Sequence, residues 1–494
     1  MKHHRPAWPS VALGWGRPMG VIGLAVLTAA CATPPAPPLQ PSVPLAASYL
    51  QASTAGAAAA APDAAWWAGY GDTRLSGFID EALAANQDVG IAVQRVRQAQ
   101  AGLQSQDARL WPSVGLQLSA SQTDSGLPAA VKQGSPDTRA LRAGLEVAWE
   151  IDVAGGVRAA RDAAQADAWA ARLGVDGARL LVASEVGRQY FLLRAAQEQL
   201  RIVQSLAATQ RETADRVASR EREGQASAFD LDRARAEADS LDAQVPLLRL
   251  QAGTAQSRLA VLLGRQPSAP VMDAAEPFAW PSPRSIAPGQ PGELLKRRPD
   301  LAAAEARVSA EGLRTEEARA QWWPKLFLNA LVGRQDLRLN ALDLAPVRFS
   351  NVALAFAMPL FNAGRIDAGI QAQSARTQEA LLAWQKATLV AVQEVEDSLL
   401  MQQQQASRSQ ALAQTVDHRQ RSLQRAQSLQ REGQIDLLVL LDVQRSVLAS
   451  ELALSDSRLQ QALADVQLYK ALGGGLPSLA SEGAFPSLAA RTSK

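Results

Sequence analysis

The side chains that could carry out covalent or metal chemistry are few in this chain of 494 residues. It contains one cysteine, Cys31, and three histidines, His3, His4 and His418. A single cysteine excludes an internal disulfide framework, and these scattered histidines do not form the ligand cluster of a zinc site. The sequence has neither the Gly-x4-Gly-Lys-Ser/Thr phosphate loop nor the Gly-x-Ser-x-Gly elbow of hydrolases. It therefore predicts no enzyme, no bound metal and no cofactor.

The chemistry that remains for Cys31 is acylation of its thiol. A positively charged start, an apolar core at residues 19–27 and small residues precede this cysteine. The pattern predicts a signal peptide over residues 1–30 and lipidation of Cys31. A Pro- and Ala-rich tether follows over residues 31–65. Thr28 stands where the lipobox pattern has leucine, so an ordinary cleaved signal with an unmodified cysteine stays open.

The net charge indicates no nucleic-acid partner. It is +2 for the whole chain, but Lys2, Arg5 and Arg17 all lie in the predicted signal peptide. Removing that segment leaves a slightly acidic chain without the basic footprint of a nucleic-acid-binding protein.

The chain carries one sequence pattern twice. Arg-Glu-Gly-Gln at residues 222–225 returns at 431–434, a shift of 209 residues, and Trp-Pro at 111–112 returns at 323–324, a shift of 212. A duplicated unit predicts pseudo-symmetric halves around a shared axis. We place the first structural repeat at residues 66–264, an inter-repeat linker at 265–292, the second repeat at 293–475, and a C-terminal tail at 476–494.

Each repeat contains long helical patterns. The stretches 154–222 and 363–431 contain no proline, and apolar residues recur at three- and four-residue spacing, which predicts helices of roughly 100 Å. Gly224 and Gly433 follow them at C′-like positions. Second helices at 227–263 and 435–472 then complete hairpins, with a kink expected at Pro246. A further helix precedes each Trp-Pro pair, at 88–110 and 300–322.

Four segments change to a period of two, at about 113–122, 141–152, 325–333 and 350–360. In the second, apolar residues alternate with Arg142, Glu146 and Glu150. Segments of about ten residues match tilted transmembrane strands. Four strands cannot close a barrel, and lipid does not tolerate open strand edges, so several chains must share one barrel. The alternative is a soluble sheet packed on a core, although no segment remains to cover it.

From about Trp66 to Gly475 the chain resembles the TolC/OprM-like outer-membrane efflux proteins, specifically the NodT-type outer-membrane lipoproteins. Its matching motifs, in order, are Trp66-Trp67 with Gly71-Asp72, Arg297-Arg298-Pro299-Asp300, both Trp-Pro pairs, Met358-Pro359-Leu360-Phe361-Asn362-Ala363-Gly364, and the run from Leu468 to Gly475.

This resemblance implies an α+β membrane protein built from a duplicated helical-hairpin and β-hairpin repeat. It implies a homotrimer with a 12-stranded β-barrel, four strands per chain, in the outer membrane, and a trimeric α-barrel in the periplasm. The implied function is a passive exit duct for small molecules in a tripartite efflux system. The implied partners are outer-membrane lipid, a periplasmic adaptor (membrane-fusion) protein and an inner-membrane pump of the RND type.

The resemblance also implies two sets of site residues. It places a periplasmic aperture at Leu438 and Asp442, where a trimer would present a ring of three leucines and a ring of three carboxylates. From the residues alone, Leu438 reads equally as a helix-seam residue and Asp442 as a solvated charge. The first tip is more charged than the family pattern, at residues 220–223. The adaptor-contacting tips are placed at Gly224, Gln225, Ser227, Gly433 and Gln434.

Two other functions stay open at this point. A lipid-anchored trimeric coiled coil with a structural or adhesive role would have the helices but no lipid-exposed strands. A periplasmic enzyme could use the carboxylates of Glu394, Glu396 and Asp397, although such runs are typical of solvated helix faces.

Overall fold

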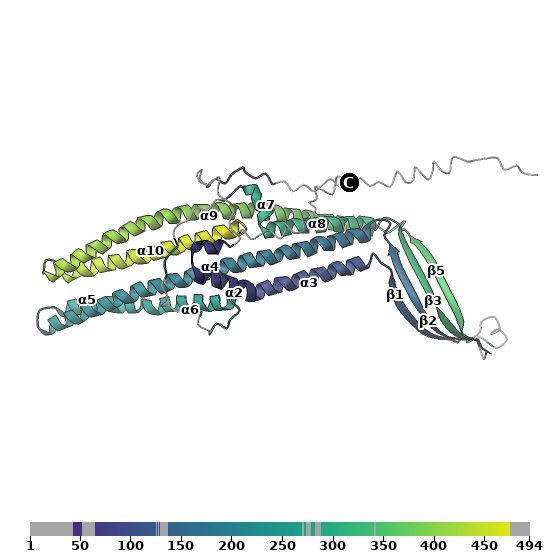
Figure 1. Ribbon diagram of the computed structural model, residues 1–494, viewed down its shortest axis with the longest axis horizontal. Helices are drawn as coiled ribbons and strands as arrows, with labels where there is room; N and C mark the ends of the chain where they lie inside the picture. Colours follow the sequence, from purple (N-terminus) through teal and green to yellow (C-terminus); the bar gives the residue numbers. More distant parts are fainter. Residues whose placement is uncertain are drawn as a thin grey trace, which may run out of the picture. The chain divides into compact units, whose positions relative to one another are not determined.

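A computed structural model describes residues 43–51, 65–124, 126, 128, 137–268, 271–272, 278–281, 288–339 and 342–474 (Figure 1). The predicted signal peptide, Cys31, most of the tether, parts of the linker and the C-terminal tail lie outside the described residues. Among the helices of the described ranges, none combines the length and the apolar character needed to cross a bilayer.

Two helices of 67 residues dominate the fold, α4 (Gly156–Arg222) and α9 (Arg365–Arg431). They begin two residues later than the sequence patterns predicted. The reason is that Gly155 and Gly364, with φ of 77° and 81°, hold left-handed backbone just outside each helix. At 1.5 Å per residue each helix is about 100 Å long.

Shorter helices pack along these two. Helices α3 (Gln87–Ala108), α5 (Ala228–Asp242) and α6 (Gln244–Leu262) contact α4, while α8 (Pro299–Ala320) and α10 (Leu437–Ala471) contact α9 (Figure 1). The remaining helical pieces are η2 (Trp66–Tyr70), α2 (Thr73–Ala85), η3 (Pro291–Glu293) and α7 (Leu294–Arg297).

The predicted helix 227–263 loses its regular hydrogen bonding at one residue, Ala243, which keeps helical backbone angles, as a kink near Pro246 requires. Ala243 separates α5 from α6, because Pro246 has no N–H to donate to the carbonyl four residues earlier. The counterpart of Pro246 at the 209-residue shift is Ser455, and α10 accordingly continues without a break.

Four antiparallel strands form one sheet in the order β1 (Ser113–Thr123), β2 (Thr138–Ile151), β3 (Lys325–Leu339) and β5 (Val347–Ala357). A two-residue strand, β4 (Leu342–Asp343), pairs with the far end of β3. They continue from the ends of α3, α4, α8 and α9 (Figure 1).

Three predicted strand boundaries are corrected. Strand β3 extends six residues beyond the predicted 325–333, and β2 starts at 138 instead of 141. The reason is that backbone ladder bonds do not require apolar side chains, and charged residues such as Arg334 and Asp336 continue the pairing. Strand β5 occupies 347–357 instead of 350–360, since Pro359 cannot donate to a ladder.

The buried core lies among the helices, in two main clusters. The first gathers Trp66, Tyr190 and Phe191 around α2, α4 and α6, and Trp66 stacks on Tyr469 of α10 at 5.1 Å between ring centroids. The second lies where α7 and α8 meet α9 and α10, and includes Leu301. Both repeats are therefore tied to each other through the helical layer.

Candidate functional site

One face of the sheet is an apolar band. Partners in register share a face, so Leu116, Leu145 and Val332 form one row across three strands. The next row is Val114, Val147, Ala330 and Val352. No described segment covers this band, and Leu116 and Val352 are 70% and 75% exposed. A band of this kind is stable only against another apolar phase or surface.

The opposite face is polar on β1 and β2, whereas its rows continue on β3 and β5 with apolar residues such as Leu331 and Phe349. Its rows include Gly115 with Glu146 and Gln117 with Gly144. The alternation of apolar and polar faces is that of a strand with lipid on one side and a water-filled lumen on the other.

Gly144 and Gly333 face each other on this polar side, and the backbones of β2 and β3 approach closely there. A Cβ on Gly333 would lie 2.2 Å from the Ala143 carbonyl oxygen and 2.6 Å from the Gly144 Cα. Only glycine fits such an approach, which lets the sheet curve.

The sheet has two free edges within the described chain, β1 and β5. These edge strands run antiparallel to each other, because β1 pairs antiparallel with β2, β2 with β3 and β3 with β5. The β5 edge of one copy can therefore pair with the β1 edge of another in the same antiparallel pattern, and closure in this way removes every edge.

At the other end of the helices, Gly224 and Gly433 turn the two hairpins in the same way. Their φ values are 74° and 70°. The N–H of Gln225 donates to the Arg220 carbonyl at 2.7 Å, and the N–H of Gln434 donates to the Leu429 carbonyl at 2.9 Å. Both are Schellman ends. The structure thus places these four predicted tip residues in two exposed turns of matching geometry.

Ser227, unlike the other predicted tip residues, is the N-cap of a helix, α5. Its hydroxyl accepts from the Asp230 N–H at 3.1 Å, while the Asp230 carboxylate accepts from the Ser227 N–H at 3.2 Å, which makes a capping box for α5. The Ser227 hydroxyl also donates to the Asp230 carboxylate at 2.6 Å, and this bond, followed by the one from the Ser227 N–H, lowers the pKa of Asp230. In the second hairpin, Asp436 stands at the N-cap of α10 and its side chain makes no capping bond. The two tips are therefore alike in their turns but not in their caps.

The predicted aperture residues lie on the first turns of α10. Leu438 is half-buried and Asp442 is exposed, and their i, i+4 spacing places them on one helix face. One turn further on, the Arg445 guanidinium forms an ion pair at 2.7 Å with Glu237 of α5. The hydrogen bonds that Arg445 donates to Glu237, then the charge of Glu237 and to a lesser degree that of Asp442, raise the pKa of Arg445. This pair joins the two hairpins just above the tips.

Sequence reasoning missed Arg445 and Glu237. The i+3 spacing from Asp442 could have indicated Arg445. Its partner is 208 residues away and only the tertiary structure identifies it.

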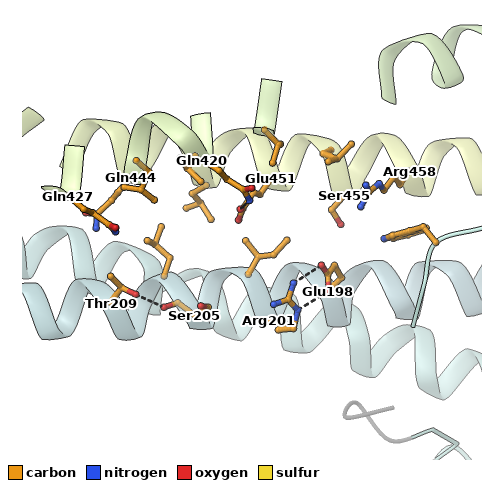
Figure 2. A pocket seen from close by; sticks show the side chains of 18 residues that line it. Glu198, Arg201, Ser205, Thr209, Gln420, Gln427, Gln444, Glu451, Ser455 and Arg458 are labelled. Atoms are coloured by element: carbon orange, nitrogen blue, oxygen red, sulfur yellow. Dashed lines mark hydrogen bonds and ion pairs between the residues drawn. The ribbon is translucent and has the colours of Figure 1, made fainter. Parts of the chain in front are cut away.

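Above this level the two hairpins face each other across a cleft of about 570 Å³ (Figure 2). Residues of α4 between Glu198 and Thr209 line one side, and residues of α9 and α10 line the other. A buried bond from the Gln210 amide to Gln444, at 2.8 Å, bridges the hairpins. Apolar contacts join the hairpins beside the cleft, since Leu448 of α10 packs in a cluster with Val203 of α4 and Leu437 packs near the first tip.

Arg298 joins three helices of the second repeat. Its guanidinium donates to Asp300 at 2.8 Å, to Glu394 of α9 at 2.6 Å and to the Ala471 carbonyl at the end of α10 at 3.2 Å. Its side chain is only 11% exposed. Burial alone would raise the pKa of Asp300, but the bonds and charge of Arg298 outweigh it and hold that pKa below its ordinary value.

Replacing Arg298 with methionine is expected to lower the free energy of unfolding by about 2 kcal/mol at pH 7, since two partly exposed carboxylates lose their partner. The pKa of Asp300 is lower in the folded state, so its contribution is present above the ordinary value of 3.8 and is lost as pH falls through the folded-state pKa. The difference in melting temperature between wild type and R298M should therefore shrink below about pH 4. Thermal unfolding of both proteins in detergent, followed by circular dichroism at pH 7 and below about pH 4, measures this difference in melting temperature. A constant difference would contradict the role of Asp300.

Comparisons with known proteins agree with this architecture. The family model described as outer membrane efflux protein matches residues 78–265 and 291–474. The pyoverdine export outer membrane protein OpmQ of Pseudomonas putida is 33% identical over 87% of this chain and 92% of its own length. Nodulation protein T of Rhizobium leguminosarum bv. trifolii is 26% identical over 79% of this chain and 83% of its own length. Among solved structures, the outer-membrane channel OprN superposes with a TM-score of 0.81 at 26% identity, covering 89% of this chain and 99% of that one.

These matches confirm the resemblance predicted from the motifs, and they do not support the structural or adhesive coiled coil. The fold is that of a trimeric channel, in which each chain gives four strands to a 12-stranded barrel and its helices to the α-barrel. The exposed apolar band and the two free sheet edges are what such a trimer requires. The chain belongs to the outer membrane efflux protein family and is the outer-membrane channel component of a tripartite efflux system.

Proposed function

We propose that this channel is the passive exit duct for a secreted organic small molecule of the siderophore class. The observation that carries this proposal is the similarity to OpmQ, a pyoverdine export protein, over nearly the whole chain. The chain itself supplies the conduit, and a separate inner-membrane pump, of the RND type, supplies the energy.

We further propose that a periplasmic adaptor docks on the two tips. Gly224, Gln225, Gly433 and Gln434 are exposed, and the two turns have the same backbone hydrogen bonds. Six turns of one geometry in a trimer would offer repeated copies of one docking surface to identical adaptor subunits. Ser227 supports the first tip through its capping box.

We propose that Leu438 and Asp442 form the periplasmic aperture. The ion pair between Arg445 and Glu237 and the bond between Gln210 and Gln444 are polar ties between the hairpins near it, and Leu437 and Leu448 add apolar contacts to the first hairpin. Opening would require the hairpins to separate along the cleft between them (Figure 2).

Residues 1–30 are proposed as a signal peptide and Cys31 as a lipid anchor in the outer membrane. An acylated cysteine places the amino terminus of the mature chain at the membrane surface, while the strands carry the insertion itself.

The combined variant Gly224→Val and Gly433→Val tests the docking proposal. A β-branched residue at positive φ costs about 1–2 kcal/mol or more per site, so both turns should rearrange. The change stays local, because a Cβ at either glycine meets nothing within 4 Å. Siderophore export from cells should fall about tenfold or more, the effect of about 1.4 kcal/mol lost from adaptor binding.

Two measurements make this test specific. Conductance of the purified trimer should stay unchanged, since the adaptor is absent. Gly253→Val, at an exposed glycine of α6 with open space for a Cβ, should export like wild type. Normal export by the tip variant would rule out adaptor docking at these turns. Normal export of siderophore by cells that lack the channel would rule out the substrate class.

A further inference from the structure

The two repeats differ in what covers their cores. In the first repeat, η2 and the 13-residue helix α2 bring Trp66, Leu75 and Phe78 onto the core. At the 212-residue shift, the counterpart of α2 falls at residues 285–297. Among the described residues there, only Pro291–Glu293 and Leu294–Arg297 are helical. Within the described residues, the second repeat therefore has only these short helical pieces where the first has the 13 residues of α2.

A segment from the amino-terminal arm takes this place. Tyr49 is 3% exposed and belongs to the second core cluster, together with Leu294, Leu301 and Val395. The neighbouring Leu50 side chain is 87% exposed, so the aromatic ring of Tyr49 is the buried anchor of this segment.

Glu396 of α9 holds the backbone next to Tyr49. Its two carboxylate oxygens accept separately, from the N–H of Leu50 at 2.7 Å and from the N–H of Gln51 at 3.1 Å. Hydrogen bonds from two adjacent amides to one carboxylate are charge-assisted, and such bonds are stronger than hydrogen bonds between neutral groups. The sequence had indicated Glu396 only as part of a solvated acidic run.

The pseudo-symmetry shows that this is a specific seat. At the 209-residue shift, Glu396 corresponds to Gly187 of α4, and a Cβ on Gly187 would lie 3.2 Å from the Trp66 ring. The same level of both long helices is thus covered by the amino-terminal region. In one repeat a glycine admits an indole, and in the other a carboxylate binds backbone amides.

We propose that residues 43–51 are a strap that is seated on Glu396 and the second core and sets how far the lipid-anchored amino terminus lies from the helical body. The distance argument rests on the lipidation of Cys31 proposed above. The 18 residue steps from Cys31 to Tyr49 reach at most about 60 Å. The 31 residue steps along α9 from Arg365, beside the sheet, to Glu396 span about 46 Å. The arm can reach its seat with a margin of only about four residues.

The seat is tested by hydrogen exchange of the full-length protein in membrane vesicles. Leu50 and Gln51 amides should be protected in wild type, and Glu396→Ala should accelerate their exchange at least tenfold. Glu396→Gln, which keeps one acceptor oxygen, should fall between. Asp397→Ala is the matched control, because this exposed neighbour contacts Gln393 instead and should change nothing. Unprotected amides in wild type, or no effect of Glu396→Ala, would overturn the strap.

The length coupling is tested by deleting residues 34–41. The ten residue steps left from Cys31 to Tyr49 then reach only about 34 Å, so the lipidated chain should lose protection of Leu50 and Gln51. A chain exported with a non-lipoprotein signal sequence and carrying Cys31→Ser should keep it despite the deletion. If the shortened chain protects the Leu50 and Gln51 amides equally with and without the lipid, the arm length and the seat are not coupled. Acyl labelling of Cys31 is measured separately, so a failure of the lipidation proposal is distinguished from a failure of the seat.

Discussion

Asp442→Ala is expected to shift the purified channel toward its open state by up to about a hundredfold, since three copies each lose up to about 1 kcal/mol of exposed charge interaction. Asp442 lies one turn from Arg445, whose guanidinium ties the two hairpins through its ion pair with Glu237. Removing the carboxylate removes the proposed ring of three charges and one of the charges that act on that guanidinium. Current through single trimers in planar bilayers gives both open probability and conductance.

Two further variants serve as a test of the inter-hairpin ion pair and as a matched control. Glu237→Gln breaks the same inter-hairpin tie from α5 and should reproduce part of the increase without changing residue 442. Asp417→Ala removes another exposed carboxylate, on α9, where it pairs with Arg421 within one helix, and should leave the current at the wild-type level. If Asp442→Ala conducts like Asp417→Ala, residue 442 does not restrict the aperture.

Gly333→Val is expected to prevent formation of the trimer in the outer membrane almost completely. The new side chain would overlap the Ala143 carbonyl and the Gly144 Cα, so β2 and β3 must separate at a point where the sheet curves. Overpacking against backbone costs about 3 kcal/mol or more per chain, and a closed barrel contains three such sites. The amount of folded trimer in outer-membrane fractions, seen as the heat-sensitive band on gels, should fall at least about tenfold.

The expected effect is graded by geometry. Gly144→Ala should reduce the trimer less, because its Cβ would lie 3.0 Å from the Val332 carbonyl oxygen, where a small shift suffices. Asn329→Val places a β-branched residue on the same strand and face, at an exposed position, and should assemble normally. Normal assembly of Gly333→Val would show that the close approach of β2 and β3 is not required.

Much of the architecture follows from local sequence patterns. The apolar spacing of α4 and α9, the left-handed glycines at 224 and 433 and the kink caused by Pro246 depend on residues within a few positions of one another. The alternation in the strands is also local, and together with the duplication it predicted the exposed sheet that needs further copies to close. The tip and aperture residues were reached by resemblance. An exposed aspartate such as Asp442 has the same local pattern whether it faces bulk water or a pore.

The tertiary structure decided the features that depend on partners far along the chain. Strand β3 continues to Leu339 because its backbone pairs with β2, whatever its side chains are. The pair Arg445–Glu237 and the seat of residues 50 and 51 on Glu396 join positions 208 and about 346 residues apart. The sequence by itself determined the elements and their repetition, because hydrophobic periodicity and turn chemistry act over one or two turns. The fold alone decided which charges meet, which glycines are pressed against backbone and what covers the second core, because those contacts exist only once distant segments are packed together.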